Sequence, residues 1–177
     1  MEGRREWMAA DGTKYSLEEL IENYGTDVLR TAYLYVNNKE AAEDLFQEVF
    51  IKVAKNLKTF EGNSSIKTWI IRITINLCKD YLKSAYQRSV VPMMDFVEDS
   101  ISSEDSFDEI ERIETAKTVK EAVQMLPKHY REVVLCVYYQ DMSLKETAQT
   151  LHIAEGTVKS RLKRAKERLK VCLEGRL

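Results

Sequence analysis

The sequence predicts an all-α protein made of two small helical domains joined by an acidic flexible linker, with a helix-turn-helix in the second domain. Apolar residues recur at helical spacing through most of the 177-residue chain, which holds only 6 glycines and 2 prolines. That periodicity fails in one acidic stretch, from about residue 85 to residue 108. No strand pattern, internal repeat or glycine-rich phosphate loop is found in the sequence.

The first domain is expected to be a bundle of three helices. Their expected ranges are residues 16–37, 39–57 and 66–84. Ser16 and Glu19 have the spacing of a capping box, in which a serine and a glutamate three residues later satisfy the first backbone N–H groups of a helix. The third helix is expected to bury Trp69, Ile70, Ile73, Leu77 and Tyr81. Since each helix alone would leave an apolar stripe in water, the three should pack together.

The linker separates two regions of opposite charge. From residue 89 to 115 there are nine acidic residues against Arg112 alone, whereas residues 155–177 hold eight Lys or Arg against three Glu. The formal net charge of −2 hides this segregation. An acidic middle followed by a basic end therefore leaves a nucleic-acid partner open, although most nucleic-acid binders are basic overall.

The second domain is expected to contain four helices, and its last two read as a helix-turn-helix. Helical periodicity resumes near Ile110, Pro127 interrupts it, and a further helix follows from Tyr130 to Tyr139. A second capping box, Ser143 to Glu146, then starts a short helix that ends near His152, in a turn where glycine is commoner.

The final helix, from about Glu155, combines one narrow apolar seam with cations on its other faces. The seam consists of Val158, Leu162, Ala165, Leu169 and Cys172. Such a helix can pack on its own domain while it presents cations to phosphates and base edges. The basic side of a helix is often simply exposed to solvent and binds nothing. Here the capped helix that precedes it favours DNA binding over that interpretation.

Composition excludes several classes of protein. The charged start is followed by no apolar stretch, and no run approaches eighteen apolar residues, so neither a secretory signal nor a membrane span is expected. Cys78, Cys136 and Cys172 have no zinc-ligand spacing and suit buried thiols in a reducing cytoplasm. With only two histidines and no nucleophile motif, we expect no enzyme, no metal and no cofactor.

Several segments, in order, resemble an extracytoplasmic-function (group IV) sigma factor of bacterial RNA polymerase. The similar segments are residues 44–52, 60–65, 67–73 with Asn76, Leu126-Pro127, 156–162 and Arg164-Ala165. The resemblance covers about residues 16 to 173. It implies an N-terminal extension (1–15), sigma domain 2 (16–84), a linker (85–108) and sigma domain 4 (109–177). About two dozen linker residues can reach up to ~80 Å, enough to join sites two duplex turns (roughly 70 Å) apart.

The resemblance also implies partners and site residues. One helix face should dock on the clamp helices of the largest subunit of core RNA polymerase, through Asp44, Gln47, Glu48, Phe50 and Lys52. The loop and third helix should capture an unpaired base at the minus-ten element, through Phe60, Asn63, Ser64, Ser65, Arg72, Asn76, Lys79 and Lys83. Small and polar groups with an aromatic wall suit such a pocket.

The last helix should read the duplex at the minus-thirty-five element. Thr157, Ser160 and Arg161 lie near its start and are expected to contact bases, whereas Lys159, Lys163 and Arg164 are expected on phosphates. By the same resemblance, an anti-sigma factor is an expected partner. The alternative function is a dimeric helix-turn-helix regulator that binds a palindromic site without polymerase, and an enzyme is a third, weaker alternative.

Overall fold

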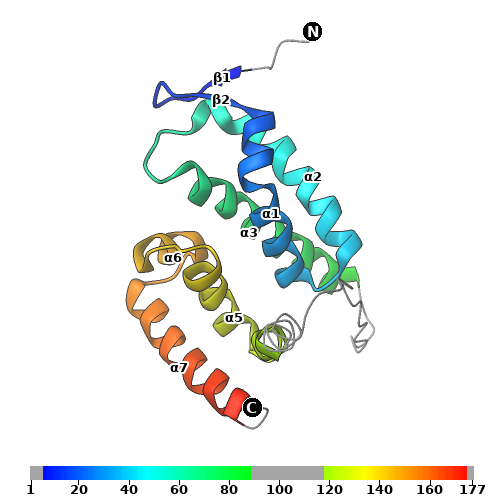
Figure 1. Ribbon diagram of the computed structural model, residues 1–177, viewed down its shortest axis with the longest axis vertical. Helices are drawn as coiled ribbons and strands as arrows, with labels where there is room; N and C mark the ends of the chain where they lie inside the picture. Colours follow the sequence, from blue (N-terminus) through cyan, green and yellow to red (C-terminus); the bar gives the residue numbers. More distant parts are fainter. Residues whose placement is uncertain (1–5, 89–117, 175–177) are drawn as a thin grey trace, which may run out of the picture.

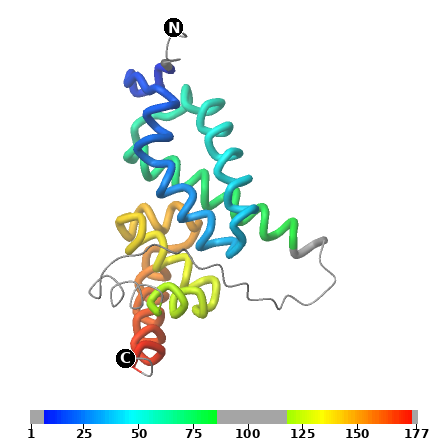
Figure 2. The backbone as a smooth tube through the Cα atoms, turned by 45° about the vertical axis from the view of Figure 1, so that its right-hand side comes forward, coloured from blue at the N-terminus to red at the C-terminus, as the bar shows by residue number. Residues whose placement is uncertain are grey.

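The structure is a computed structural model, which describes residues 6–88 and 118–174. It confirms the all-α, two-domain prediction: a bundle of three long helices lies above a second group of helices (Figure 1). Figure 2 shows the same division from another side, with the first bundle in blue to green and the second group in yellow-green to red. We call them the N-terminal unit and the C-terminal unit. Most of the expected linker, residues 89–108, lies outside the described residues.

A short β-hairpin precedes the first helix, and the expectation that the chain has no strand was therefore wrong. Strand β1 (Glu6–Met8) pairs antiparallel with β2 (Lys14–Ser16), with Trp7 opposite Tyr15. Each strand has three residues, too few for an alternating pattern to be recognised in a sequence. Gly12 in the connecting turn has φ +82°, a backbone conformation that glycine adopts most readily.

The N-terminal unit consists of α1 (Leu17–Val36), α2 (Lys39–Asn56), a 3₁₀ turn η1 (Leu57–Thr59) and α3 (Ile66–Arg88). The expected capping box at Ser16 was wrong, because Ser16 makes no side-chain cap and its hydroxyl instead donates to Glu18 at 2.6 Å. Helix α2 does have a side-chain cap, where Asn38 Oδ1 accepts from the N–H of Ala41 at 2.8 Å. Helix α3 extends four residues beyond its expected end at residue 84.

The core of the N-terminal unit includes Val28, Val49 and Val53, none of which is exposed to solvent. On α3 the fully buried side chains include Ile70, Ile71, Thr74, Ile75 and Cys78. The expectation that Tyr81 is buried was wrong, since it is 39% exposed. The prediction assumed one apolar stripe, whereas α3 packs against α1 and α2 and also against the C-terminal unit, so its buried surface is wider.

The C-terminal unit comprises a described helical segment at residues 118–125, then α5 (Lys128–Val134), the π-helical turn η2 (Leu135–Tyr139), α6 (Leu144–Leu151) and α7 (Glu155–Glu174). The capping box from Ser143 to Glu146 is confirmed in both directions. His152 ends α6 at φ +56°, in the left-handed conformation expected of a glycine-preferring turn. Val158 and Ala165 of the expected seam are fully buried.

The two units share one continuous apolar core, which includes Tyr35 of α1, Cys78 of α3 and Cys136 of the C-terminal unit. Polar contacts also join them. Gln140 Nε2 donates to Thr31 Oγ1 at 2.6 Å, and Gln124 Nε2 donates to Asn37 Oδ1 at 2.8 Å. Among the helices that the structure describes, none has the length and hydropathy needed to cross a bilayer.

Candidate polymerase and nucleic-acid interfaces

The exposed face of α2 is acidic. Asp44, Gln47 and Glu48 are exposed, and Lys52 is partly exposed one turn further on. Phe50, which was expected to anchor a partner on this face, is instead 4% exposed and packs against Phe46 with ring centroids 5.0 Å apart. Its position follows Val49 on the helix, and both side chains face the bundle core.

Ile51 supplies the apolar group that Phe50 cannot. Its side chain is 53% exposed, next to Glu48 in the helical arrangement, because residues three and four apart share one helix face. An exposed isoleucine among acids suits a protein partner that offers an apolar contact inside a basic surface. Sequence reasoning missed it because Ile51 and Phe50 are adjacent and only packing shows which one points outward. We call Asp44, Gln47, Glu48 and Ile51 the α2 face.

The loop at residues 60–65, which we call the recognition loop, exposes only part of the expected site. Phe60 is 3% exposed, with its ring between Tyr15 (centroids 6.2 Å apart) and Trp69 (5.4 Å). It therefore supports the loop from below rather than offering its face to a base. Asn63 and Ser65 are exposed and Ser64 is partly exposed, so these three side chains remain accessible.

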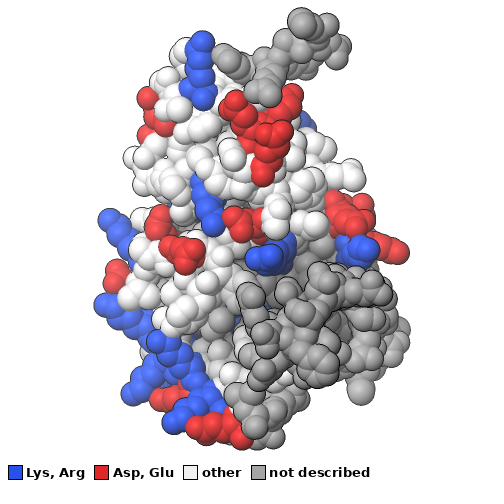
Figure 3. Space-filling view, viewed as in Figure 1, with Lys and Arg blue, Asp and Glu red and all other residues white. Residues whose placement is uncertain are grey.

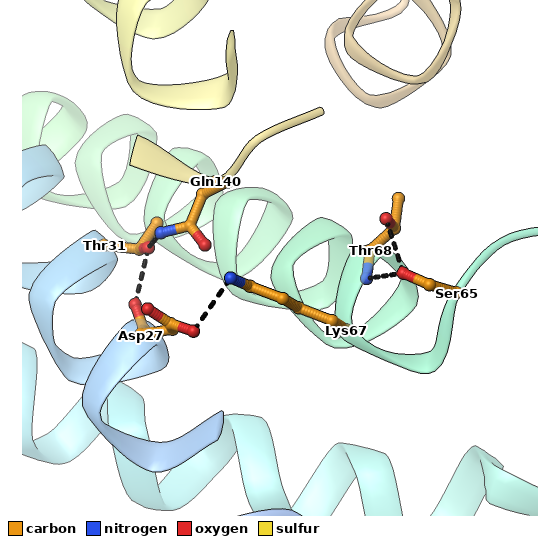
Figure 4. A network of polar contacts seen from close by, with 6 residues as sticks. All are labelled: Asp27, Thr31, Ser65, Lys67, Thr68 and Gln140. Carbon is orange, nitrogen blue, oxygen red and sulfur yellow. Dashed lines mark hydrogen bonds and ion pairs between the residues drawn. The ribbon is translucent and has the colours of Figure 1, made fainter. Parts of the chain in front are cut away.

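Ser65 belongs to the recognition loop and also caps the start of α3. Its Oγ accepts from the backbone N–H of Thr68 at 3.0 Å and lies 2.9 Å from the hydroxyl of Thr68 (Figure 4). Thr68 Oγ1 in turn donates to Glu146 Oε1 of α6 at 3.1 Å. A carboxylate only accepts, so this chain of hydrogen bonds connects the recognition loop to the helix-turn-helix capping box.

A second set of contacts holds α3 on α1. Lys67 Nζ lies 3.0 Å from Asp27 Oδ2, and Thr31 Oγ1 donates to the carbonyl of Asp27 at 2.6 Å (Figure 4). Gln140 reaches the same Thr31 hydroxyl from the C-terminal unit. The start of α3, and with it the recognition loop, is therefore fixed by both units.

The polar residues expected along α3 are not equally accessible. Lys83 is exposed, and Asn76 and Lys79 are partly exposed. Arg72 lies against α6: its Nε donates to Thr150 Oγ1 at 3.4 Å, and its Nη2 is buried with no hydrogen-bond partner among the described residues. Because a buried N–H group without a hydrogen-bond partner costs free energy, the unpaired Nη2 makes this contact between the units an imperfect one.

Helix α7 presents a cationic surface, and Figure 3 shows Lys and Arg gathered along the edge of the molecule where α7 lies. Lys159, Ser160, Lys163 and Arg164 are exposed, whereas Thr157 and Arg161 are partly exposed. Ser160 Oγ donates to the carbonyl of Thr157 at 3.0 Å, which leaves its lone pairs free. Lys159 pairs with Glu155 at 3.3 Å on the solvent side, a contact that phosphate can replace.

On another side of α7, a groove of about 710 Å³ separates this helix from the start of the C-terminal unit. Its lining includes Met125, Tyr130, Arg164, Arg168 and Val171. The Arg168 guanidinium lies 5.3 Å from the centroid of the Tyr130 ring, a cation–π contact. Arg164 therefore lies between the groove and the exposed cationic face.

Burial changes the chemistry of two thiols. Burial raises the pKa of Cys78 to about 12 and that of Cys136 to about 12, with a further contribution at Cys136 from nearby Glu132. Burial also raises the pKa of Tyr35, whose hydroxyl has no hydrogen-bond partner in the described part of the chain. These groups stay neutral and unreactive at physiological pH. Within residues 6–88 and 118–174, no cluster of three metal-ligating side chains occurs.

The pKa of Glu146 is lowered, first by the hydrogen bond from the backbone N–H of Ser143 and then by the hydroxyls of Ser143 and Thr68 and the charge of Arg72. Desolvation acts in the opposite direction and is outweighed. An ionised Glu146 is therefore favoured by both the helix cap and the contact between the units.

Sequence models of two families match the two units. The model of Sigma-70 region 2 matches residues 20–88, and that of Sigma-70 region 4 matches residues 116–169. The chain is 31% identical over 158 residues to the ECF RNA polymerase sigma factor SigM of Mycobacterium tuberculosis, covering 89% of this chain and 77% of SigM. It is 28% identical over 170 residues to the ECF RNA polymerase sigma factor SigW of Bacillus subtilis, covering 90% and 89%.

The fold is also similar to a solved structure. The sigma factor RpoE of Bartonella quintana, determined in complex with the anti-sigma factor NepR, superimposes with a TM-score of 0.73 at 24% identity, over 89% of this chain and 96% of RpoE. Two sigma regions in this order, on a helical fold with an exposed cationic α7, lead to one conclusion: the chain belongs to the ECF family of RNA polymerase sigma factors.

Proposed function

We propose that this chain, as a group IV member of its family, binds core RNA polymerase and directs initiation by reading two promoter elements with its two units. Residues 16–84 serve as sigma domain 2 and residues 109–177 as sigma domain 4, joined by the linker 85–108. The observation that carries the proposal is the pairing, in one chain, of an acidic exposed face on α2 with a cationic exposed face on α7. The first suits a protein partner and the second suits DNA.

The α2 face docks on the clamp helices of the largest polymerase subunit. Asp44 and Glu48 provide charges that are complementary to a basic surface, Gln47 provides a hydrogen-bonding amide, and Ile51 provides apolar contact. Phe50 acts indirectly, by fixing α2 on the bundle core through Phe46. The like charges on this face disfavour a direct contact with DNA phosphates.

The recognition loop captures an unpaired base of the minus-ten element. Asn63 and Ser64 offer donors and acceptors to a base edge, and Ser65 orders the loop by capping α3. Asn76 is partly exposed on the adjacent face of α3, with Lys79 and Lys83 beyond it for phosphates. Capture of a base that thermal motion has already unstacked needs no nucleotide hydrolysis, so the protein acts without catalysis of its own.

The start of α7 reads duplex DNA at the minus-thirty-five element. Thr157, Ser160 and Arg161 lie in its first two turns, where a recognition helix reaches base edges. Lys159, Lys163 and Arg164 bind phosphates, and they keep the register of the helix in the groove.

The two units must part before both elements are read. The described arrangement holds α3 against α6 and covers Arg72, whereas the two promoter elements lie roughly 70 Å apart along two duplex turns. Separation exposes Arg72 for a phosphate and frees Thr68. We therefore assign the described arrangement to the protein before it engages a promoter.

Other parts of the proposal follow from this role. The protein acts in the cytoplasm, where its polymerase and promoter partners are found. An anti-sigma factor is a proposed partner, supported by a fold similar to that of a sigma factor solved with one. The dimeric regulator is not favoured, because the relatives found are sigma factors of similar length.

Run-off transcription tests the proposal directly. Core polymerase is combined with a library of promoters that vary at both elements, with and without the protein. Initiation that depends on the protein and on both elements is the expected result. A protein that binds a palindromic duplex tightly on its own, and starts no transcript with core polymerase, would contradict it.

A further inference from the structure

The β-hairpin lies directly against the recognition loop. Strand β1 contacts η1, and the backbone N–H of Asp11 donates to the carbonyl of Phe60 at 3.3 Å. Figure 1 shows the hairpin at the end of the bundle where the loop between α2 and α3 lies. The hairpin precedes the segment that the region 2 family model matches, which starts at residue 20. It lies outside the segment that this family model matches, and it is placed against the loop that is proposed to capture a base.

Asp11 and Gly62 form the closest part of this contact. Gly62 has φ +72°, a conformation that side chains rarely adopt. A Cβ at this position would lie 3.1 Å from Asp11 Cβ and 3.2 Å from Asp11 Oδ2. Any residue other than glycine would have to displace Asp11 or shift the recognition loop. The loop and the hairpin therefore determine each other's position.

The hairpin turn (residues 9–13) is held in one conformation by its own hydrogen bonds. Asp11 Oδ1 accepts from the N–H of Thr13 at 2.8 Å, and the N–H of Ala9 donates to the carbonyl of Thr13 at 2.9 Å. The N–H of Gly12 donates to the carbonyl of Ala9 at 3.0 Å. A turn with this many internal bonds presents a fixed surface to Gly62.

The hairpin also secures the first residue of the loop. Tyr15 on β2 packs edge-on against Phe60, with an angle of 74° between the rings, and Phe60 packs against Trp69 of α3. Edge-to-face aromatic pairs add stability beyond the area they bury. The hairpin thus holds the recognition loop at Phe60 and again at Gly62, immediately before the exposed Asn63 and Ser64.

We propose that the hairpin turn is a specificity-determining part of the minus-ten site, in which Asp11 is a positioning residue for the recognition loop. By fixing Gly62, Asp11 sets where Asn63 and Ser64 present their donors and acceptors to an unpaired DNA base. Because hydrogen bonds weaken steeply with distance and angle, a small shift of the loop changes which base fits. This inference rests on the proposed function of the loop.

The test uses the full chain bound to core polymerase, on four promoters that differ only in the captured base. The variants are Gly62→Ala, Asp11→Gly and the two combined, with Met8→Ala as a control on a 59% exposed hairpin residue. We expect each single variant to lower the ratio of initiation on the best base to that on the others by roughly fivefold or more, the low end of one base contact. The double variant should lower this ratio no further than Gly62→Ala does, because both changes disturb the same contact between Asp11 and Gly62.

A second readout separates positioning from folding. With 2-aminopurine at the captured position, wild-type holoenzyme should raise its fluorescence on base extrusion. Asp11→Gly should alter that rise while its melting temperature stays near that of Met8→Ala, whereas Gly62→Ala should alter the rise and melt at a lower temperature because of its strained backbone. If the variants reduce initiation equally on all four promoters, or leave the base preference unchanged, the hairpin has no part in selection. If wild-type holoenzyme starts no transcript on any promoter, the proposed function itself fails.

Discussion

The side-chain amide of Gln140 donates a 2.6 Å hydrogen bond to the hydroxyl of Thr31, and both residues are buried where the C-terminal unit meets α1. The same hydroxyl donates to the carbonyl of Asp27, so Thr31 is used in both directions. Gln140 Oε1 has no hydrogen-bond partner among the described residues. The hydrogen bond to Thr31 is therefore the one that the structure describes for this side-chain amide. Loss of that hydrogen bond would leave a buried side-chain amide without a partner.

Thr31→Val should therefore lower the free energy of unfolding by about 1–3 kcal/mol, the cost of a buried polar group without a partner. Valine has nearly the volume of threonine, so packing changes little. Urea denaturation followed by circular dichroism measures the difference. Thr59→Val is the matched control, since it removes an exposed hydroxyl that bonds the carbonyl of Asn56. Equal effects of the two variants would show that the contact between the units adds nothing.

Glu146→Gln should remove one pH-dependent part of the protein's stability. The pKa of Glu146 is lowered in the folded state, so its ionised form stabilises the fold above its unfolded value of 4.5, and this stabilisation is lost as the pH falls through the folded pKa. Glutamine keeps the reach of the capping box but has no charge. The melting temperatures of wild type and variant should differ near neutral pH and converge on acidification. A constant difference across that range would contradict this assignment.

Arg161→Ala and Lys163→Ala should affect transcription differently. Arg161 is partly buried near the start of α7, whereas Lys163 is exposed. We expect Arg161→Ala to change the preferred minus-thirty-five sequence, and Lys163→Ala to weaken all promoters and reduce the salt slope by about 1. In vitro transcription across salt concentrations on a promoter library measures both. Uniform losses for Arg161→Ala would remove this residue from the specificity set.

Asp44→Arg combined with Glu48→Arg should abolish binding to core polymerase while the fold persists. Both side chains are exposed on the α2 face, so the substitution reverses the charge of the surface without entering the core. Co-purification with polymerase and circular dichroism provide the two measurements. Glu22→Arg with Asp80→Arg makes the same charge change at exposed positions of α1 and α3. Retained binding by the α2 variant would exclude this docking face.

The three cysteines should differ in reactivity. Cys78 and Cys136 are buried with pKa values raised to about 12, and Cys172 on α7 is partly exposed. A thiol-specific reagent at mildly alkaline pH should label one thiol quickly and two only after unfolding, because the thiolate is the reactive form. Mass spectrometry of the labelled peptides identifies each site. Fast labelling of Cys78 in the native protein would show that the shared core opens readily.

The helices and most of their starts could be predicted from the sequence, because caps and apolar periodicity are local signals. The capping box at Ser143, the end of α1 at Asn37 and the left-handed His152 are all of this kind. The capping box at Ser16 has the same letters but was wrong. There the preceding residues form a strand, and the serine hydroxyl bonds Glu18 instead.

The site was harder to predict because exposure depends on contacts between distant segments. Phe50 and Phe60 have the residue type of a binding anchor, yet the bundle core and the hairpin cover them. Arg72 lies on the expected polar face of α3, and α6 packs over it. Neither the hairpin nor the contact between the units has a local signature, since both depend on residues that are far apart in the sequence. The exposed Ile51 could be identified only once Phe50 was placed.

The two carboxylate oxygens of Glu146 have separate tasks. Oε2 accepts from the N–H and the hydroxyl of Ser143, which starts α6, whereas Oε1 accepts from Thr68 of the other unit. Of the hydrogen bonds to Glu146, separation of the two units breaks only the one from Thr68 to Oε1, because those from Ser143 to Oε2 lie within the C-terminal unit. The cap of α6 therefore does not depend on the N-terminal unit, whereas the contact between the units also includes the Gln140–Thr31 and Arg72–Thr150 hydrogen bonds and a shared apolar core.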